Sequence, residues 1–152
     1  MRRASFFAHG QEVIKLSRRH ESRELAFQLL FERSFSNAEI EELMELAMMA
    51  RDIVPDDYVL RILRGVEEKQ EELDAIIARF SRARTLARLS KVVLAVLRLS
   101  LYEIAYFDGI DAPVSINEAV ELTKTYGGKD ESGFVNGVLG SYVRSLEEAG
   151  EQ

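Results

Sequence analysis

The sequence contains no cysteine and no tryptophan, and only 2 of its 152 residues are proline. Without cysteine the chain can form no disulfide, thiolate metal site or thiol nucleophile, which fits a reducing compartment and predicts a cytoplasmic protein. Its 2 histidines both lie within the first 20 residues, so a histidine-based catalytic or metal centre is not expected. The composition therefore argues against an enzyme that uses these groups, and no metal or cofactor is predicted.

Long hydrophobic runs are also missing. The most apolar run, VVLAVLRLSLY at residues 92–102, contains Arg98 and is about half as long as a membrane-spanning helix. The N-terminus starts with basic residues but lacks the apolar core of a signal peptide. The chain is therefore not expected to enter a membrane, and the apolar run predicts a buried helix.

Apolar residues recur with the spacing of helices. In the first such segment they occupy Leu25, Ala26, Leu29 and Leu30, which share one face of a helix. No segment alternates convincingly with the period of two that is typical of strands. With 47% hydrophobic residues, a chain of this length can bury one core. The pattern predicts an all-α fold.

About six helices, arranged as two three-helix bundles, account for this pattern. Residues 1–16 show no convincing period and are predicted to form a flexible extension, whereas residues 17–152 form a single helical domain. The two halves of that domain are expected at about 17–82 and 83–150. The predicted helices begin at Glu21 and then cover residues 40–53, 55–80, 90–107, 116–126 and 134–148.

Local start signals support several of these helices. Pro55 is expected to open the third helix, because proline fits the first helical position. Ser36 with Glu39, and Ser115 with Glu118, have the spacing of a capping box, in which each side chain satisfies a free backbone N–H. Two helices are therefore predicted to begin directly after these serines.

Positive charge is concentrated near the N-terminus of a chain whose net charge is -6. Residues 1–34 hold 7 Lys and Arg against 4 Asp and Glu, giving +3, so the remainder carries -9. In SRRHESRELAFQLLFE, Arg18, Arg19, His20 and Arg23 lie at the start of a helix, where the helix dipole favours carboxylates. The arrangement suits a polyanionic partner such as RNA, although an ordinary solvated helix end explains the charge nearly as well.

Aromatic residues offer two further candidate contacts. Phe27, Phe31 and Phe35 form a second stripe on the first helix, which suits either a partner surface or the centre of a bundle. Phe134 lies beside a glycine at a helix start and could stack on an unpaired base, or be buried. The neighbouring GGKDESG resembles a phosphate loop only superficially, because Asp130 follows the lysine and no strand precedes it. Nucleotide hydrolysis is not expected.

Three segments carry a resemblance to a known family. RELAFQLLFE, VLRLSLYEI and VSINEAVELTKTYGGKDESGFVNGVLG, in this order and spacing, resemble the NusB family of bacterial transcription antitermination factors, over about residues 17–145. The resemblance implies two three-helix bundles and no catalysis. It also implies binding to the single-stranded boxA element of ribosomal RNA transcripts together with the ribosomal protein NusE, within an antitermination complex that makes RNA polymerase resistant to termination.

The resemblance also assigns residues to these partners. NusE would contact the phenylalanine stripe. Glu21 and Gly133 stand where the family is often more basic, which predicts weak RNA binding by the chain alone and tighter binding with NusE. The implied RNA-binding residues are Arg18, Arg19, His20, Arg23, Gln28, Arg98, Lys129, Asp130 and Phe134, and the implied partner-binding residues are Phe31 and Phe35.

Other functions remain open at this point. A similar domain begins some ribosomal RNA cytosine methyltransferases, but neither a glycine-rich cofactor fold nor a cysteine nucleophile follows here. A helical protein-protein adaptor without intrinsic RNA specificity is the main alternative, and salt-dependent RNA binding distinguishes the two. Self-association as a homodimer also stays open.

Overall fold

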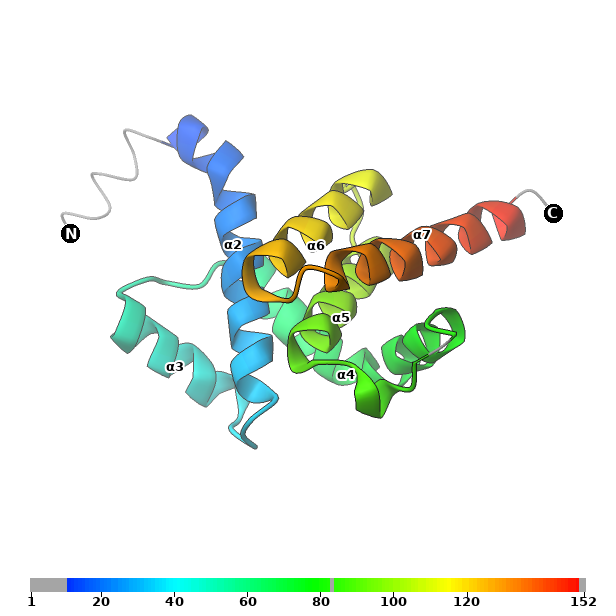
Figure 1. The fold of residues 1–152 in the computed structure, drawn as a ribbon. Coiled ribbons are helices and arrows are strands. Elements are labelled where there is room, and N and C mark those ends of the chain that lie inside the picture. The colour runs from blue at the N-terminus through cyan, green and yellow to red at the C-terminus, as the bar shows by residue number, and fades with distance from the viewer. Residues whose placement is uncertain (1–10, 83, 151–152) are drawn as a thin grey trace.

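The computed structural model describes residues 11–82 and 84–150, with side chains from residue 18 onward. All regular structure in these ranges is helical, which confirms the all-α prediction and the expected six α-helices (Figure 1). The elements are α2 (Gln11–Arg33), α3 (Ile40–Arg51), α4 (Asp57–Phe80), the 3-10 turn η1 (Leu86–Arg88), α5 (Lys91–Tyr106), α6 (Ala112–Tyr126) and α7 (Glu131–Gly150).

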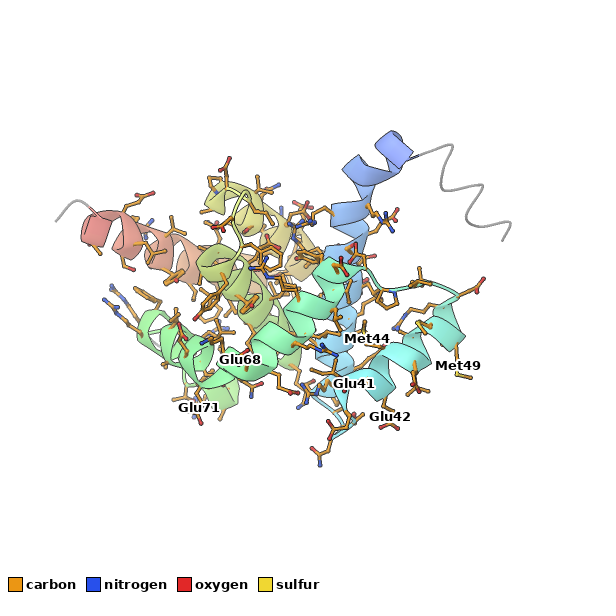
Figure 2. The ribbon with its side chains drawn as sticks, turned by 180° about the vertical axis from the view of Figure 1, so that it is seen from behind. Glu41, Glu42, Met44, Met49, Glu68 and Glu71 are labelled. Carbon is orange, nitrogen blue, oxygen red and sulfur yellow. The ribbon has the colours of Figure 1, made fainter. Side chains whose placement is uncertain are left out.

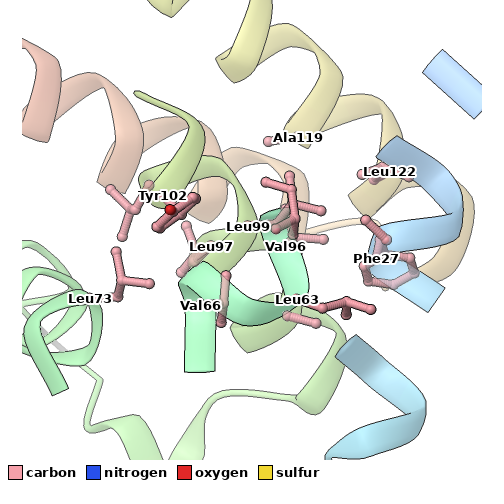
Figure 3. Close-up of a cluster of buried hydrophobic side chains, with 14 of the residues drawn as sticks. Phe27, Leu63, Val66, Leu73, Val96, Leu97, Leu99, Tyr102, Ala119 and Leu122 are labelled. Atoms are coloured by element: carbon pink, nitrogen blue, oxygen red, sulfur yellow. The ribbon is translucent and has the colours of Figure 1, made fainter. Parts of the chain in front are cut away.

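Helix α5 is the centre of the fold. It packs against α2 and α4 on one side and against α6 and α7 on the other (Figure 1). Side chains from these helices form one continuous hydrophobic cluster, in which Phe27, Leu63, Val96 and Leu122 come from four different helices (Figure 3). The two halves expected on either side of residue 83 therefore share a core through α5.

The first helix starts earlier than the sequence predicts. Helix α2 begins at Gln11, so residues 11–16 of the predicted extension are helical. Adding a turn to an existing helix is easy, because each added residue gains a hydrogen bond without a new nucleation step. The rest of the predicted extension, residues 1–10, lies outside the described residues.

Two helix starts are capped by side chains, but Pro55 does not occupy the first helical position as expected: it precedes the N-cap Asp56, and α4 begins at Asp57. Asp56, which follows Pro55, caps α4 by accepting a hydrogen bond from the backbone N–H of Val59 at 3.0 Å. Ser90 caps α5 in the same way, with its Oγ 3.1 Å from the Val93 nitrogen. Both side chains satisfy a backbone donor that the helix itself leaves unpaired.

Both predicted capping boxes are wrong. Helix α3 begins at Ile40 with Glu39 as its N-cap and no side-chain cap. Helix α6 begins at Ala112, so Ser115 lies inside the helix, where its hydroxyl donates to the buried carboxylate of Glu103 at 2.5 Å. The Ser115 hydroxyl therefore forms a tertiary hydrogen bond and does not cap α6.

Helix α3 turns apolar side chains both inward and outward. Leu43 and Ala47 are buried, and Met44 packs against the core. Leu46 and Met49 are 53% and 82% exposed, and Met49 lies on the outer side of α3 in Figure 2. Helix α3 is thus an amphipathic helix whose outer face also carries apolar surface.

Candidate nucleic-acid interface

The basic residues at the start of the described part of α2 divide into two groups. Arg18, Arg19 and His20 are exposed, whereas Arg23 is buried, with 3% of its side chain accessible. Because three or four residues complete one helical turn, Arg19 and Arg23 lie on the same side of α2. That side faces the rest of the molecule at Arg23 and reaches solvent at Arg19.

Arg23 is paired inside the fold. Its Nε and Nη2 atoms donate to the two carboxylate oxygens of Glu103, each at 3.0 Å, and its Nη1 lies 3.5 Å from Glu118. Burial alone would lower the pKa of Arg23, but the hydrogen bond to Glu103 and the nearby charges outweigh it and raise the pKa above its ordinary value. The expectation that Arg23 contacts RNA phosphates is therefore not supported by its position.

Glu103 is the centre of a buried polar network. Its side chain is inaccessible, and besides Arg23 it accepts hydrogen bonds of 2.5 Å from the hydroxyls of Tyr58 and Ser115. Burial, followed by the nearby Glu103 carboxylate, raises the pKa of Tyr58, so its hydroxyl keeps its proton and donates. The network joins α2, α4, α5 and α6, and every buried polar side-chain atom described has a partner.

Two exposed side chains of α2 contact residues in or beside this network. The Arg19 guanidinium lies 4.4 Å from the centre of the Tyr58 ring. His20 Nδ1 lies 2.8 Å from Glu118, whose other oxygen faces Arg23. Arg18 makes no hydrogen bond, ion pair or ring contact with any residue that the structure describes.

Gln28 connects α2 to the end of α6. Its amide donates to the Tyr126 hydroxyl at 2.8 Å, and the Tyr126 ring packs on Phe27 with centroids 4.9 Å apart. The loop that follows α6 carries Lys129 and Asp130, both exposed. Gln28 and this loop therefore occupy the same edge of the molecule.

The start of α7 holds that loop in place. Glu131 accepts from the Gly128 nitrogen at 2.7 Å and from Ser90 Oγ at 2.8 Å, which links the loop to the start of α5. Phe134, one turn later, is half-buried against the core, and the Arg84 guanidinium lies 4.6 Å from its ring centre. Phe134 is therefore neither fully buried nor fully exposed.

Arg98 lies at a different place. It forms a bidentate pair with Asp74 of α4, with nitrogen to oxygen distances of 2.8 and 2.9 Å. It also lines a cavity of about 590 Å³ between α2, α4 and α5, whose lining includes no other predicted RNA-binding residue. Arg33 and Lys91 contribute further positive charge there.

The predicted partner-binding phenylalanines form a ladder at the end of α2. Phe31 stacks on Phe27 at 6.1 Å, and Phe35 meets Phe31 edge-on at 5.0 Å. Phe31 is half-buried, but Phe35 is 63% exposed, with the Lys91 ammonium 4.9 Å from its ring centre. An exposed phenylalanine is available to a partner protein.

Sequence reasoning missed Tyr58, Glu103 and Arg84. Glu103 offered a signal, because a single carboxylate within the most apolar helix must find a buried partner. Nothing local marked Tyr58 or Arg84. In the described ranges no cluster of acidic or histidine side chains could hold a metal ion, and no helix is long and apolar enough to cross a membrane.

Comparison with known proteins identifies the family. The model of the NusB family matches residues 20–144. The transcription antitermination protein NusB of Acetivibrio thermocellus is 41% identical over 83% of this chain and 88% of its own length, and that of Carboxydothermus hydrogenoformans is 41% identical over 88% and 98%.

Solved structures agree. T. maritima NusB superposes with a TM-score of 0.72 at 32% identity, covering 81% of this chain and 88% of that one. A structure of the antitermination factors NusB and NusE in complex with double-stranded RNA gives a TM-score of 0.75 at 25% identity, covering 84% and 96%. The chain therefore belongs to the NusB family of transcription antitermination proteins, which are not enzymes.

Proposed function

We propose that this protein binds the boxA RNA of ribosomal RNA operon transcripts together with NusE, and so makes RNA polymerase resistant to termination. The observation that carries the proposal is the exposed cluster of Arg18, Arg19 and His20 on a chain whose remaining surface is acidic. The relative solved with NusE and RNA supports the same partners. Such a complex forms in the cytoplasm, where transcripts are made.

The RNA would cross the edge formed by α2 and the loop between α6 and α7. Arg18, Arg19 and Lys129 would contact phosphates, and Gln28 would donate to a base or sugar, because its amide already reaches the surface at Tyr126. Phe134, which is half-buried, would stack on a base with the part of its ring that stays accessible. His20 and Asp130 would border the same path.

The remaining predicted residues have other places. Arg23 is excluded from the proposed contact surface because it is buried against Glu103. Arg98 lines the cavity at the end of α2, so it would meet RNA only if the strand continued there. Phe35, with Phe31 behind it, would form the apolar contact to NusE.

Fluorescence anisotropy tests the proposal directly. A labelled boxA-type single strand, a scrambled strand and a duplex would be titrated with the protein, with and without NusE, across a salt series. Each phosphate contact on a single strand should add about -0.7 to the slope of log affinity against log salt. Sequence-dependent binding that tightens with NusE is expected.

Charge reversal locates the RNA surface. The double variant Arg18→Glu, Arg19→Glu should abolish the salt-dependent binding, because it replaces attraction with repulsion. The control is Arg144→Glu, an exposed arginine of α7 outside the proposed RNA path. Equal RNA affinity of both variants at low salt would contradict the proposed surface.

One observation favours the adaptor function as a second candidate. The outer face of α3 exposes Leu46 and Met49, while Glu42 and Glu45 beside them pair with no described residue. Apolar surface of this kind is typical of protein interfaces. A protein that bound NusE but no RNA would support this alternative. Analytical ultracentrifugation of the same samples would show whether the chain self-associates.

A further inference from the structure

Arg18 and Arg19 are neighbours of the same residue type, yet the structure treats them differently. Both are exposed on the same turn of α2. Only Arg19 has a described partner, the ring of Tyr58, at 4.4 Å from the guanidinium. We propose that Tyr58 is a positioning residue for RNA binding, which holds the Arg19 guanidinium ready for a phosphate and is itself locked by the buried Glu103. The proposal rests on the proposed RNA-binding function.

The Tyr58 ring is fixed at both ends. It lies one residue into α4, is 5% exposed, and packs against Phe107 with ring centroids 5.3 Å apart. Its hydroxyl donates to Glu103 at 2.5 Å, and Glu103 is held in turn by Arg23 and Ser115 from α2 and α6. The ring orientation is therefore set directly by Phe107 and by Glu103 of α5, and through Glu103 by α2 and α6.

This fixed ring suits a cation. The face of an aromatic ring attracts a guanidinium electrostatically. A hydroxyl that donates to a carboxylate polarises its ring toward more negative charge, which strengthens that attraction. Arg19 forms no hydrogen bond or ion pair with a described residue, so its N–H groups stay free to donate to a phosphate.

Pre-organisation of the Arg19 side chain should raise the affinity for RNA. A flexible arginine loses rotamer freedom when it binds a phosphate, and ordering a long side chain beforehand is worth about two- to ten-fold in affinity. Arg19 has lost part of that freedom before RNA arrives, whereas Arg18 has not. Lysine can replace the charge of either residue but cannot reproduce the stacked planar group.

The test compares the two conservative variants. Arg19→Lys should weaken RNA binding about two- to ten-fold more than the matched control Arg18→Lys. In the background of Tyr58→Leu, the two lysine variants should have equal effects, because the ring that distinguishes them is gone. A ring that only stabilised the fold would leave the difference between the lysine variants unchanged in that background.

A second measurement needs neither RNA nor a change to the buried Tyr58. Nuclear magnetic resonance relaxation of the arginine Nε–H groups in the unmodified protein should give a clearly higher order parameter for Arg19 than for Arg18, which should lie in the flexible range below about 0.6. Circular dichroism would confirm that each variant is folded.

The outcomes separate the two hypotheses. Equal losses from the two lysine variants, or equally mobile arginines, would overturn the positioning role of Tyr58. A difference that persists in Tyr58→Leu would also overturn it. Failure of the unmodified protein to bind any RNA, with or without NusE, would instead overturn the proposed function.

Discussion

Replacing Arg23 by methionine tests whether this arginine is a structural residue or an RNA contact. Methionine keeps most of the volume of the side chain but removes both hydrogen bonds to Glu103 and the positive charge that pairs with that carboxylate. Breaking a buried ion pair by removing one partner costs about 3–5 kcal/mol, because the other charge is left uncompensated.

The structure indicates that the loss of stability lies near the lower end of this range. Glu103 would still accept hydrogen bonds from Tyr58 and Ser115, so it would not be left without donors. We therefore expect a loss of about 3 kcal/mol in the free energy of unfolding. For a chain of this size that corresponds to a melting temperature lower by about 6–12 °C.

Urea unfolding followed by circular dichroism measures this loss. In the double variant Arg23→Met, Glu103→Gln the buried charge is absent, and much of the lost stability should return, because neutral replacement of a buried pair is often tolerated. A single-variant loss below about 1 kcal/mol, or a double variant no more stable than the single one, would refute the buried network.

RNA binding by the folded single variant gives the complementary result. If Arg23 does not meet phosphate, the slope of log affinity against log salt should match that of the unmodified protein. A slope reduced in magnitude by about 0.7 would show that Arg23 contacts a phosphate on a single strand, and would restore the role implied by the family resemblance.

Three further changes test local features of the site. Ser90→Ala should lower the free energy of unfolding by about 1 kcal/mol in urea, since it removes the cap of α5, whereas Ser90→Asn should retain that cap and can still donate to Glu131. Asp130→Asn should tighten RNA binding in the anisotropy assay without loss of stability if the carboxylate lies near phosphates; unchanged affinity would place it away from them. Phe35→Ala should alter the unfolding free energy by less than about 0.5 kcal/mol, because the ring is 63% exposed, yet weaken capture of NusE.

Local chemistry predicted some helix boundaries and missed others for a physical reason. Asp56 and Ser90 each cap a helix by satisfying a backbone donor a few residues away, which needs no distant partner. Ser115 has an equally good local signal, but α6 begins earlier, at Ala112, so the serine lies inside the helix and donates to Glu103, a partner that is visible only once α5 and α6 are packed. Sequence patterns indicate which local hydrogen bonds are favourable, whereas the packing of the helices determines which of them form.

The need to know the packing also explains what the sequence could not predict about the candidate site. The basic cluster near the start of α2 was visible from composition, but its division into exposed Arg18 and buried Arg23 was not. Arg23 and Glu103 are separated by 80 positions in the sequence, so no local pattern links them. Arg23 could be assigned to RNA only because the pattern of a basic helix start does not say which side of the helix faces the core.

The partners of the exposed cations also bear on affinity. In the free protein His20 faces Glu118 and Arg19 lies on Tyr58, while Arg18 and Lys129 have no partner among the described residues. A phosphate that approaches His20 would meet the Glu118 carboxylate, whose negative charge would reduce the gain from this contact. Few free cations on an acidic body should give weak binding by the chain alone, which makes tightening by NusE the sharper test of the proposed complex.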